Sequence, residues 1–233
     1  MRKIFITATD TGAGKTFVTA QLTRILHRRG IRVRALKPVA CGAEKGQIHA
    51  DVAVLMRAQE ISDPGRVCLY SFAMPAAPGI AAAAEKRRIE PEKLIRWCEE
   101  MSRDADICLI EGIGGLMVPL VDHFLVCDWL AGLPEVKTLL VAGARLGAIN
   151  HSLLTLNQLR AVRRDPDWIA VNCPETGLEQ SVQHLRQVLA GLVPACDVVT
   201  IPHLENSGRD AASFVRLADH MIDACITNKT TDG

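Results

Sequence analysis

The sequence predicts an α/β fold in which a mainly parallel central sheet is covered by helices on both faces. Short, continuously apolar runs alternate along the chain with amphipathic stretches of helical spacing. Strands that are buried on both faces have such a composition, because helices pack on each side of a parallel sheet. The 233 residues and the 48% hydrophobic content are enough for one well-buried domain. We therefore expect a single domain over residues 1–225 and a flexible tail over residues 226–233.

Six apolar runs are the expected strands of the sheet. They cover residues 3–8, 32–37, 106–112, 137–143, 167–173 and 196–202. Helices are expected where apolar residues recur every three or four positions, since this spacing places them on one face. These stretches cover residues 18–26, 52–56, 178–189 and 211–225, and a further helix is expected to begin near Asn150. The basic run at residues 27–34 fits the solvated end of the first helix and the start of an edge strand.

The composition excludes several classes of partner. A formal net charge of +1 gives no electrostatic reason to expect binding to nucleic acid or to an anionic membrane. No run of 18 apolar residues is present, so no membrane-spanning helix is expected. The eight cysteines have no CxxC spacing, and most lie in apolar runs, where cysteine behaves as a small hydrophobe. A reduced cytoplasm is the expected location.

The segment ITATDTGAGKT, residues 6–16, is typical of a phosphate-binding loop. It follows an apolar strand and opens an amphipathic helix, which is the context that such a loop requires. Backbone amides at the start of that helix can surround a β-phosphate; they belong to Gly12, Ala13, Gly14, Lys15 and Thr16. The Lys15 ammonium would reach the β- and γ-phosphate oxygens, and the Thr16 hydroxyl would bind Mg²⁺. Ala8 stands where the loop's first glycine is usual, which we expect to cost less than about 1 kcal/mol.

Two carboxylates are candidates for the same magnesium ion. Mg²⁺ prefers oxygen ligands and keeps several waters, so one or two carboxylates are enough. Glu111 ends an apolar strand and enters the glycine-rich EGIGG, where a buried carboxylate needs a partner. Asp51 opens a helical stretch and could equally be a simple helix N-cap. These features predict a Mg-ATP or Mg-GTP site at the carboxyl edge of the sheet.

Two further strand ends carry polar features. Lys37, in LKPVACG, could approach the γ-phosphate from the side of an acceptor and stabilise charge during phosphoryl transfer. From its position alone it could as well be a surface lysine. The segment ARLGAINHSLLT, residues 144–155, has a Leu-Gly turn that leads into a helix. That helix N-terminus could bind a carboxylate, although a well-capped helix is the commoner reason for such a pattern.

Seven short motifs, in the same order, resemble the dethiobiotin synthetase family. They are TDTGAGKT, LKPVACG, HADV, EGIGG, LGAINHSLLT, VN at residues 171–172 and IPHLEN. The resemblance covers residues 3–222 and implies a cytoplasmic homodimer with the P-loop NTPase fold, with Mg²⁺ as cofactor and ATP as co-substrate. The implied substrates are 7,8-diaminononanoate and CO2. One amine forms a carbamate, ATP phosphorylates the carbamate to a mixed anhydride, and the other amine closes the ureido ring of dethiobiotin.

The resemblance also implies roles for individual residues. The implied magnesium ligands are Thr16, Asp51 and Glu111, and the implied catalytic residues are Lys15, Lys37 and Thr11. The substrate would contact Thr11, Lys37 and Cys41, together with Gly147 and Asn150 of the opposite subunit, so that the site lies at the dimer interface. The residues implied in ATP binding are Gly12, Ala13, Gly14, Lys15, Thr16, Phe17, Asp51, Glu111, Gly112, Ile113, Gly114, Asn172, Cys173, Pro202, His203 and Leu204.

Several positions depart from the family pattern. Besides Ala8, Cys41 stands where serine or threonine is common, and Cys173 stands where aspartate is common. Ala77 and Gly79 take the places of a usual serine and histidine. A thiol is a poorer hydrogen-bond donor than a hydroxyl, so we expect a weaker contact between Cys41 and the carbamate.

Three alternative functions can be compared with the sequence. A P-loop switch ATPase related to the partition and septum-site ATPases would carry a lysine five residues before the GK pair, where this chain has Thr9. A cobyrinate-type amide synthase would need an amidotransferase portion, for which 233 residues leave no room. A plain nucleotide-binding scaffold would have no use for the two lysines and two carboxylates together. ATP hydrolysis that does not depend on the diamine would favour the switch or the scaffold.

Overall fold

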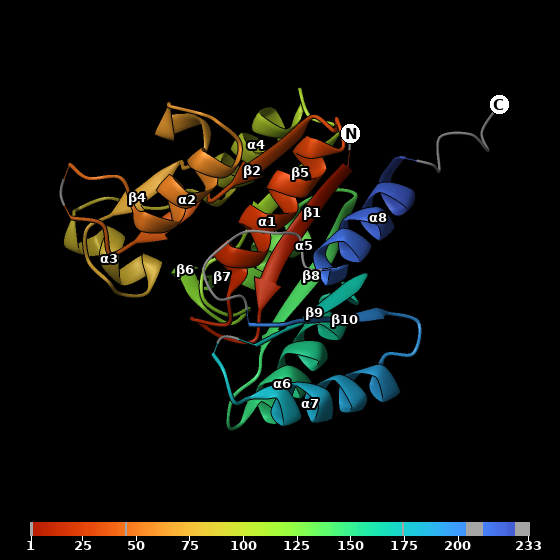
Figure 1. The fold of residues 1–233 in the computed structure, drawn as a ribbon. Coiled ribbons are helices and arrows are strands. Elements are labelled where there is room, and N and C mark those ends of the chain that lie inside the picture. Colours follow the sequence, from red (N-terminus) through yellow and green to blue (C-terminus); the bar gives the residue numbers. More distant parts are fainter. Residues whose placement is uncertain (1, 45, 174, 204–211, 227–233) are drawn as a thin grey trace.

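The computed structural model describes residues 2–44, 46–173, 175–203 and 212–226. A six-stranded sheet with the order β10-β9-β8-β1-β5-β2 lies at its centre, and every neighbouring pair of strands in it is parallel (Figure 1). The strands are β1 (Arg2–Ala8), β2 (Val33–Leu36), β5 (Ile107–Glu111), β8 (Val136–Gly143), β9 (Trp168–Asn172) and β10 (Asp197–Ile201). All six predicted strands are therefore confirmed.

Helices cover both faces of the sheet. They are α1 (Lys15–Arg28), α2 (Ala50–Ala58), α3 (Pro78–Ala84), α4 (Pro91–Ser102), α5 (Val126–Gly132), α6 (Ala148–Ala161), α7 (Glu179–Leu192) and α8 (Ala212–Ile226), with a short 3₁₀ helix at Pro64–Arg66. The predicted helices correspond to α1, α2, α6, α7 and α8. Of the tail expected over residues 226–233, Ile226 ends α8 and the rest lies outside the described residues.

The alternation of side chains along β1 shows how the two layers are built. Ile4 and Ile6 point to one face, where they pack with α1 and α8, and Phe5 points to the other, where it meets Trp129 of α5 edge-on. In Figure 1, α1 and α8 lie in front of the sheet, and α4 and α5 lie behind it. Both faces of β1 are thus buried, which accounts for its continuously apolar sequence.

Two small sheets were not predicted. β3 (Val39–Cys41) and β4 (Tyr70–Phe72) pair in parallel, and β6 (Pro119–Val121) pairs with β7 (Phe124–Leu125) as an antiparallel hairpin. Each of these strands has three residues or fewer. β3 follows β2 directly, whereas β4 comes after α2 and the 3₁₀ helix.

The outer edge of β2 is closed by side-chain and loop contacts. The Gln59 carboxamide accepts a hydrogen bond from the Ala35 amide at 3.1 Å and donates one to the Ala35 carbonyl at 2.7 Å. The amide of Lys37 donates to the Val67 carbonyl at 2.8 Å. The basic run before β2 is, as predicted, the exposed end of α1, with His27 and Arg28 in its last turn.

Two further expectations concern membranes and cysteines. Across the described ranges, none of the helices combines the length and the apolar composition that a bilayer crossing requires. All eight cysteines, each of which lies in the described part of the chain, are free thiols. Five of them are buried, in agreement with their expected behaviour as small hydrophobes.

Candidate active site

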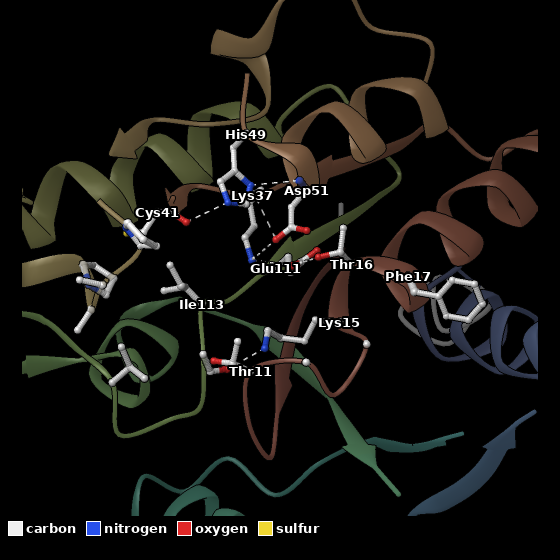
Figure 2. Close-up of a pocket in the computed structure, with 18 residues that line it drawn as sticks. Thr11, Lys15, Thr16, Phe17, Lys37, Cys41, His49, Asp51, Glu111 and Ile113 are labelled. Carbon is white, nitrogen blue, oxygen red and sulfur yellow. Dashed lines mark hydrogen bonds and ion pairs between the residues drawn. The ribbon is translucent and has the colours of Figure 1, made fainter. Parts of the chain in front are cut away.

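A cavity of about 750 Å³ opens at the carboxyl edge of the sheet, where β1, β2 and β5 end. Its lining comes from five segments: the loop after β1 with the start of α1, the residues that follow β2, the start of α2, the loop that leads into α3, and the end of β5 with the loop after it. The lining residues that were predicted from the sequence are Thr11, Gly12, Gly14, Lys15, Thr16, Phe17, Lys37, Cys41, Asp51, Ala77, Glu111, Ile113 and Gly114. Figure 2 shows the side chains that converge on it.

The phosphate-binding loop is shaped by Gly14 and braced by Asn172. Gly14 caps α1 with a φ of 99°, which favours glycine, and a Cβ added there would lie 2.2 Å from Nδ2 of Asn172. The same Nδ2 donates a hydrogen bond to the Ala13 carbonyl at 3.0 Å, so a side chain at the end of β9 holds the phosphate-binding loop. Ala8, at the end of β1, is fully buried. Alanine is thus accommodated where glycine is usual.

Lys15 is buried and holds its ammonium in the cavity. Its Nζ donates to the Gly114 carbonyl at 2.9 Å and to the Asp10 carbonyl at 3.3 Å. Burial, and then the charge of Lys37, lower the pKa of Lys15 from 10.5 to about 8, although nearby carboxylates oppose the shift. An ammonium disfavoured in this way gains much from an incoming anion, because a phosphate replaces both the lost water and the missing counter-charge.

Lys37 is not a surface lysine. Only 3% of it is exposed, and its Nζ lies 2.7 Å from Oε1 of Glu111, 2.9 Å from the Gly112 carbonyl and 3.8 Å from Oδ2 of Asp51. Figure 2 shows its side chain reaching down between Asp51 and Glu111 toward the cavity. The structure therefore brings both predicted lysines into one cavity, with the ammonium groups held on carbonyls of the EGIGG segment.

Glu111 is fully buried, and only one of its two carboxylate oxygens has hydrogen-bond partners among the described residues. Its Oε1 accepts hydrogen bonds from Lys37 and from the Thr16 hydroxyl, each at 2.7 Å. Its Oε2 has no hydrogen-bond partner among the described residues. A buried carboxylate oxygen without a partner is costly, and a divalent cation is one group that could satisfy it. The oxygen donors of Thr16, Glu111 and Asp51 are of the kind that Mg²⁺ prefers, so this donor set fits the predicted ion.

The start of α2 corrects one alternative reading of Asp51. His49, not Asp51, is the N-cap of this helix, because its Nδ1 accepts a hydrogen bond from the Asp51 amide at 3.1 Å. Asp51 lies in the first turn, with a carboxylate that is 37% exposed and faces the cavity. Its side chain is thereby free to serve as a ligand. Across the described ranges, no three His, Cys, Asp or Glu side chains form a metal cluster, and a phosphate-bound magnesium needs fewer.

The lining of the cavity contains apolar as well as polar residues. Its apolar members include Ala76, Ala77, Pro78, Ile113 and Val118. Cys41 is half-buried at the end of β3, and burial raises the pKa of its thiol to about 11, so it is a neutral thiol at neutral pH. Gly79 does not line the cavity. A Cβ at Gly79 would lie 3.3 Å from the Leu120 carbonyl, so this glycine lets α3 pack closely against β6.

A second cavity, of about 540 Å³, gathers three of the residues implied in ATP binding. Cys173, Pro202 and His203 line it, beside Thr176 and Gln183. Leu204 lies outside the described residues. Asn172 is absent from this lining, since its side chain faces the phosphate loop.

Three other residues that were predicted to bind ligands lie outside the polar part of these cavities. Phe17 turns its ring away from the polar groups of the first cavity (Figure 2). The ring packs edge-on against that of Phe214 in α8, with the two ring centroids 5.7 Å apart. Gly147 and Asn150, at the start of α6, line neither of the two cavities. Next to them, Leu146 and Ile149 are exposed.

Sequence reasoning missed three kinds of contact in the first cavity. The carbonyls of Gly112 and Gly114, which hold the two lysines, carry no side-chain signal. The loop residues Pro75 and Ala76 have no polar group that would have marked them. His49 was part of the HADV motif, and a polar residue two positions before a helical aspartate was the signal for its capping role.

Comparisons with known proteins bear on this site. A family model described as an AAA domain matches residues 2–204. The ATP-dependent dethiobiotin synthetase of Anoxybacillus flavithermus is 34% identical over 209 residues, which cover 88% of this chain and 94% of that protein. Those of Cellvibrio japonicus and Escherichia coli K12 are 36% and 32% identical, and the matches cover 96% and 93% of this chain and 99% and 98% of those proteins.

Solved structures share the fold at much lower identity. The septum site-determining protein MinD of Pyrococcus horikoshii, complexed with Mg-ADP, has a TM-score of 0.58 at 17% identity, with 98% of this chain and 99% of that chain covered. The hydrogenase maturation factor HypB of Archaeoglobus fulgidus has a TM-score of 0.57 at 14% identity, with 97% and 90% covered. These likenesses show the P-loop NTPase fold alone. The sequence relatives cover 88% to 96% of the chain at 32% to 36% identity, and the chain therefore belongs to the dethiobiotin synthetase family.

Proposed function

We propose that this chain is an ATP-dependent dethiobiotin synthetase that closes the ureido ring of dethiobiotin from 7,8-diaminononanoate and CO2, with Mg²⁺. Family membership supports the overall reaction. The observation that carries the assignment of residues is the buried contact between Lys37 and Glu111, next to the phosphate-binding loop. This contact supports the proposal that Lys37 is a second cation for the acceptor anion and the γ-phosphate.

The proposed chemistry has three steps. One amine of the substrate attacks CO2 and loses a proton, which gives a carbamate. A carbamate oxygen then attacks the γ-phosphorus of ATP, the bond to the bridging oxygen breaks, and ADP leaves. The second amine attacks the carbonyl carbon of the resulting carbamic-phosphoric anhydride, the carbon–oxygen bond breaks, and phosphate leaves as the ring closes and the amine loses a proton.

The residues of the cavity divide this work. Lys15 would hold β- and γ-phosphate oxygens together with the amides of the loop. Lys37 would hold the carbamate and the transferring phosphoryl oxygens, so that two anions can approach each other. The Thr11 side chain and Cys41 would face the carbamate or the diamine. When bound at Thr16, Asp51 and Glu111, Mg²⁺ would neutralise phosphate charge.

The apolar residues of the lining suit the remaining part of the substrate. A diaminononanoate has an aliphatic chain between its amines and its carboxylate, and Ala76, Ala77, Pro78, Ile113 and Val118 offer apolar contact to such a chain. The second cavity, with Cys173, Pro202 and His203, would take the adenine.

We further propose that the working unit is a homodimer in the cytoplasm. Large apolar side chains are exposed around the start of α6 and on the neighbouring loop, and they are Met117, Leu146, Ile149 and Leu154. Met117 and Leu154 line one surface hollow, and exposed large apolar side chains that gather in one region are typical of an interface. A partner on this surface would bring its own Gly147 and Asn150 toward the site, where the helix N-terminus could bind the substrate carboxylate.

One experiment tests the proposed function directly. The purified protein is incubated with Mg-ATP, bicarbonate and 7,8-diaminononanoate, and dethiobiotin is sought by mass spectrometry while ADP and phosphate are counted. We expect one ADP for each dethiobiotin and little hydrolysis without the diamine. ATP hydrolysis that ignores the diamine, with no dethiobiotin formed, would favour a P-loop switch ATPase instead.

A further inference from the structure

His49 connects two parts of the cavity that have different proposed tasks. Its Nε2 lies 3.0 Å from the carbonyl oxygen of Cys41, at the end of β3, and its Nδ1 lies 3.1 Å from the amide nitrogen of Asp51, in the first turn of α2. The side chain is only 16% exposed and lines the cavity itself. Figure 2 shows the ring between Cys41 and Asp51, with one contact on each side.

The two contacts define one form of the ring. The Asp51 amide can only donate, so Nδ1 must accept and carries no proton. The proton of a neutral imidazole is then on Nε2, where it donates to the Cys41 carbonyl. In this form the 3.9 Å approach of Nδ1 to Oδ2 of Asp51 is no ion pair, and the ring holds Asp51 through the helix backbone.

The backbone of Asp51 decides where its carboxylate lies. Lys37 is 3.8 Å away, which is longer than a good hydrogen bond, and the carboxylate is 37% exposed. Among the residues that the structure describes, the first turn of α2 is therefore the main constraint on this side chain. On the other side, the Cys41 carbonyl belongs to the residue that faces the proposed carbamate.

We propose that His49 is a positioning residue that sets Asp51 for the metal and Cys41 for the diamine substrate through separate ring nitrogens. This inference rests on the proposed function for what the two ends would bind. It goes further in assigning one side chain to couple the metal side and the substrate side of the cavity. A helix cap that served stability alone would stabilise α2 and leave both ligands unaffected.

Two substitutions separate the contact of His49 with Asp51 from its contact with Cys41. His49→Asn keeps an oxygen near the position of Nδ1 and can still cap α2, but its side chain is too short to reach the Cys41 carbonyl. His49→Gln places an amide nitrogen near the position of Nε2 and can still donate to that carbonyl, but it loses the cap. His27→Gln is the matched control, since His27 is exposed at the far end of α1.

Metal binding is measured without turnover. Mn²⁺ is titrated into the ADP-bound protein, and free Mn²⁺ is followed by electron paramagnetic resonance. We expect His49→Gln to weaken Mn²⁺ binding about tenfold, in the range usual for residues that orient metal ligands. We expect His49→Asn and His27→Gln to bind Mn²⁺ like the unchanged protein.

The substrate end is measured in two ways. His49→Asn should raise the KM for 7,8-diaminononanoate about tenfold, because small displacements of a positioning group are costly. It should also speed hydrogen exchange in peptides that cover residues 38–44, and that readout does not need turnover. His49→Gln should leave this KM and this exchange nearly unchanged.

The outcomes decide between the two roles. Opposite patterns in the two variants support the proposal. The proposal is overturned if both variants lose Mn²⁺ affinity and diamine binding equally. It is also overturned if neither quantity changes in either variant while the melting temperature and the circular dichroism spectrum stay native. If the unchanged protein makes no dethiobiotin, the proposed function fails, yet the Mn²⁺ titration and the hydrogen exchange still decide whether His49 holds both ends.

Discussion

Lys15 and Lys37 present two buried ammonium groups to the same cavity, and the charge of Lys37 contributes to lowering the pKa of Lys15. They come from different elements, since Lys15 opens α1 and Lys37 follows β2. Each is held by a backbone carbonyl of the loop after β5, at 2.9 Å in both cases. The electrostatic repulsion between the two ammonium groups is unfavourable, and anions that bind next to both lysines would reduce it.

Replacement of Lys37 should separate chemistry from nucleotide binding. We expect Lys37→Ala to lower dethiobiotin formation by about a hundredfold or more, because a cation aimed at the developing charge is lost. The affinity for ADP, measured by calorimetry, should change little, since the phosphate loop stays intact. Loss of ADP binding would show that Lys37 serves the nucleotide and not the acceptor.

The lowered pKa of Lys15 should appear in the pH dependence of nucleotide binding. Its ammonium loses its proton above about pH 8 in the free protein, and a bound triphosphate stabilises the charged form. ATP affinity should therefore fall as pH rises above that value, by up to about tenfold per pH unit, with proton uptake on binding.

Calorimetry in buffers of different ionisation enthalpy measures this uptake. Lys15→Arg is the control, because arginine keeps its charge over this range. Its affinity could differ from that of the unchanged protein, but its pH slope should be flat. A similar slope in both proteins would assign the proton to another group.

Glu111→Gln tests the half-satisfied carboxylate. The substitution keeps the shape of the side chain but leaves Lys37 without its buried counter-charge, so the free energy of unfolding should fall by about 3 kcal/mol. The Mg²⁺ concentration for half-maximal activity should rise at least about tenfold, because an oxygen ligand loses its charge. Urea unfolding and a magnesium titration measure the two effects; an unchanged magnesium dependence would remove Glu111 from the proposed ligands.

Cys41→Ser should improve the fit to the acceptor. The Cys41 thiol is neutral, with a pKa of about 11, and donates a weak hydrogen bond. A hydroxyl in its place should lower the KM for the diamine by about two- to tenfold, which is the usual net value of one hydrogen bond. Cys68→Ser is the control, since Cys68 does not line the cavity. Equal effects of both substitutions would indicate a general change in packing.

Leu154→Glu tests the proposed dimer. Leu154 is 60% exposed on α6, and a carboxylate in an apolar interface would be desolvated without a partner. Light scattering should show a monomer, and the KM for the diamine should rise while ADP binding is retained. Leu192→Glu, at an exposed position at the end of α7, should leave the dimer intact. A monomeric unchanged protein with full activity would contradict the proposal.

The central sheet was predictable because its strands are buried on both faces. Residues 107–110 are apolar throughout, and β5 is buried at every position. The short strands β3, β4, β6 and β7 were not predictable, because two or three residues show no alternation. Helix α4 was also missed; only three of its twelve residues are buried, so its apolar face is narrow.

The site was predictable where side chains carry the chemistry. Lys15, Lys37, Asp51 and Glu111 converge as expected, because strand ends of a parallel sheet meet at one edge. Their partners were not predictable, because the lysines rest on backbone carbonyls and any residue could supply one. The proposed role of Gly147 and Asn150 in the site requires a second chain, which the pattern within one chain does not place.

The carboxamide of Gln59 has a consequence for how copies of this chain can associate. An unpaired edge strand is a template to which a strand of another molecule can add, and repeated addition of this kind produces open-ended aggregates. At β2 the outward amide and carbonyl of Ala35 are already taken by Gln59. This edge of the sheet therefore discourages open-ended stacking, and the proposed dimer would form instead through the exposed apolar side chains around the start of α6.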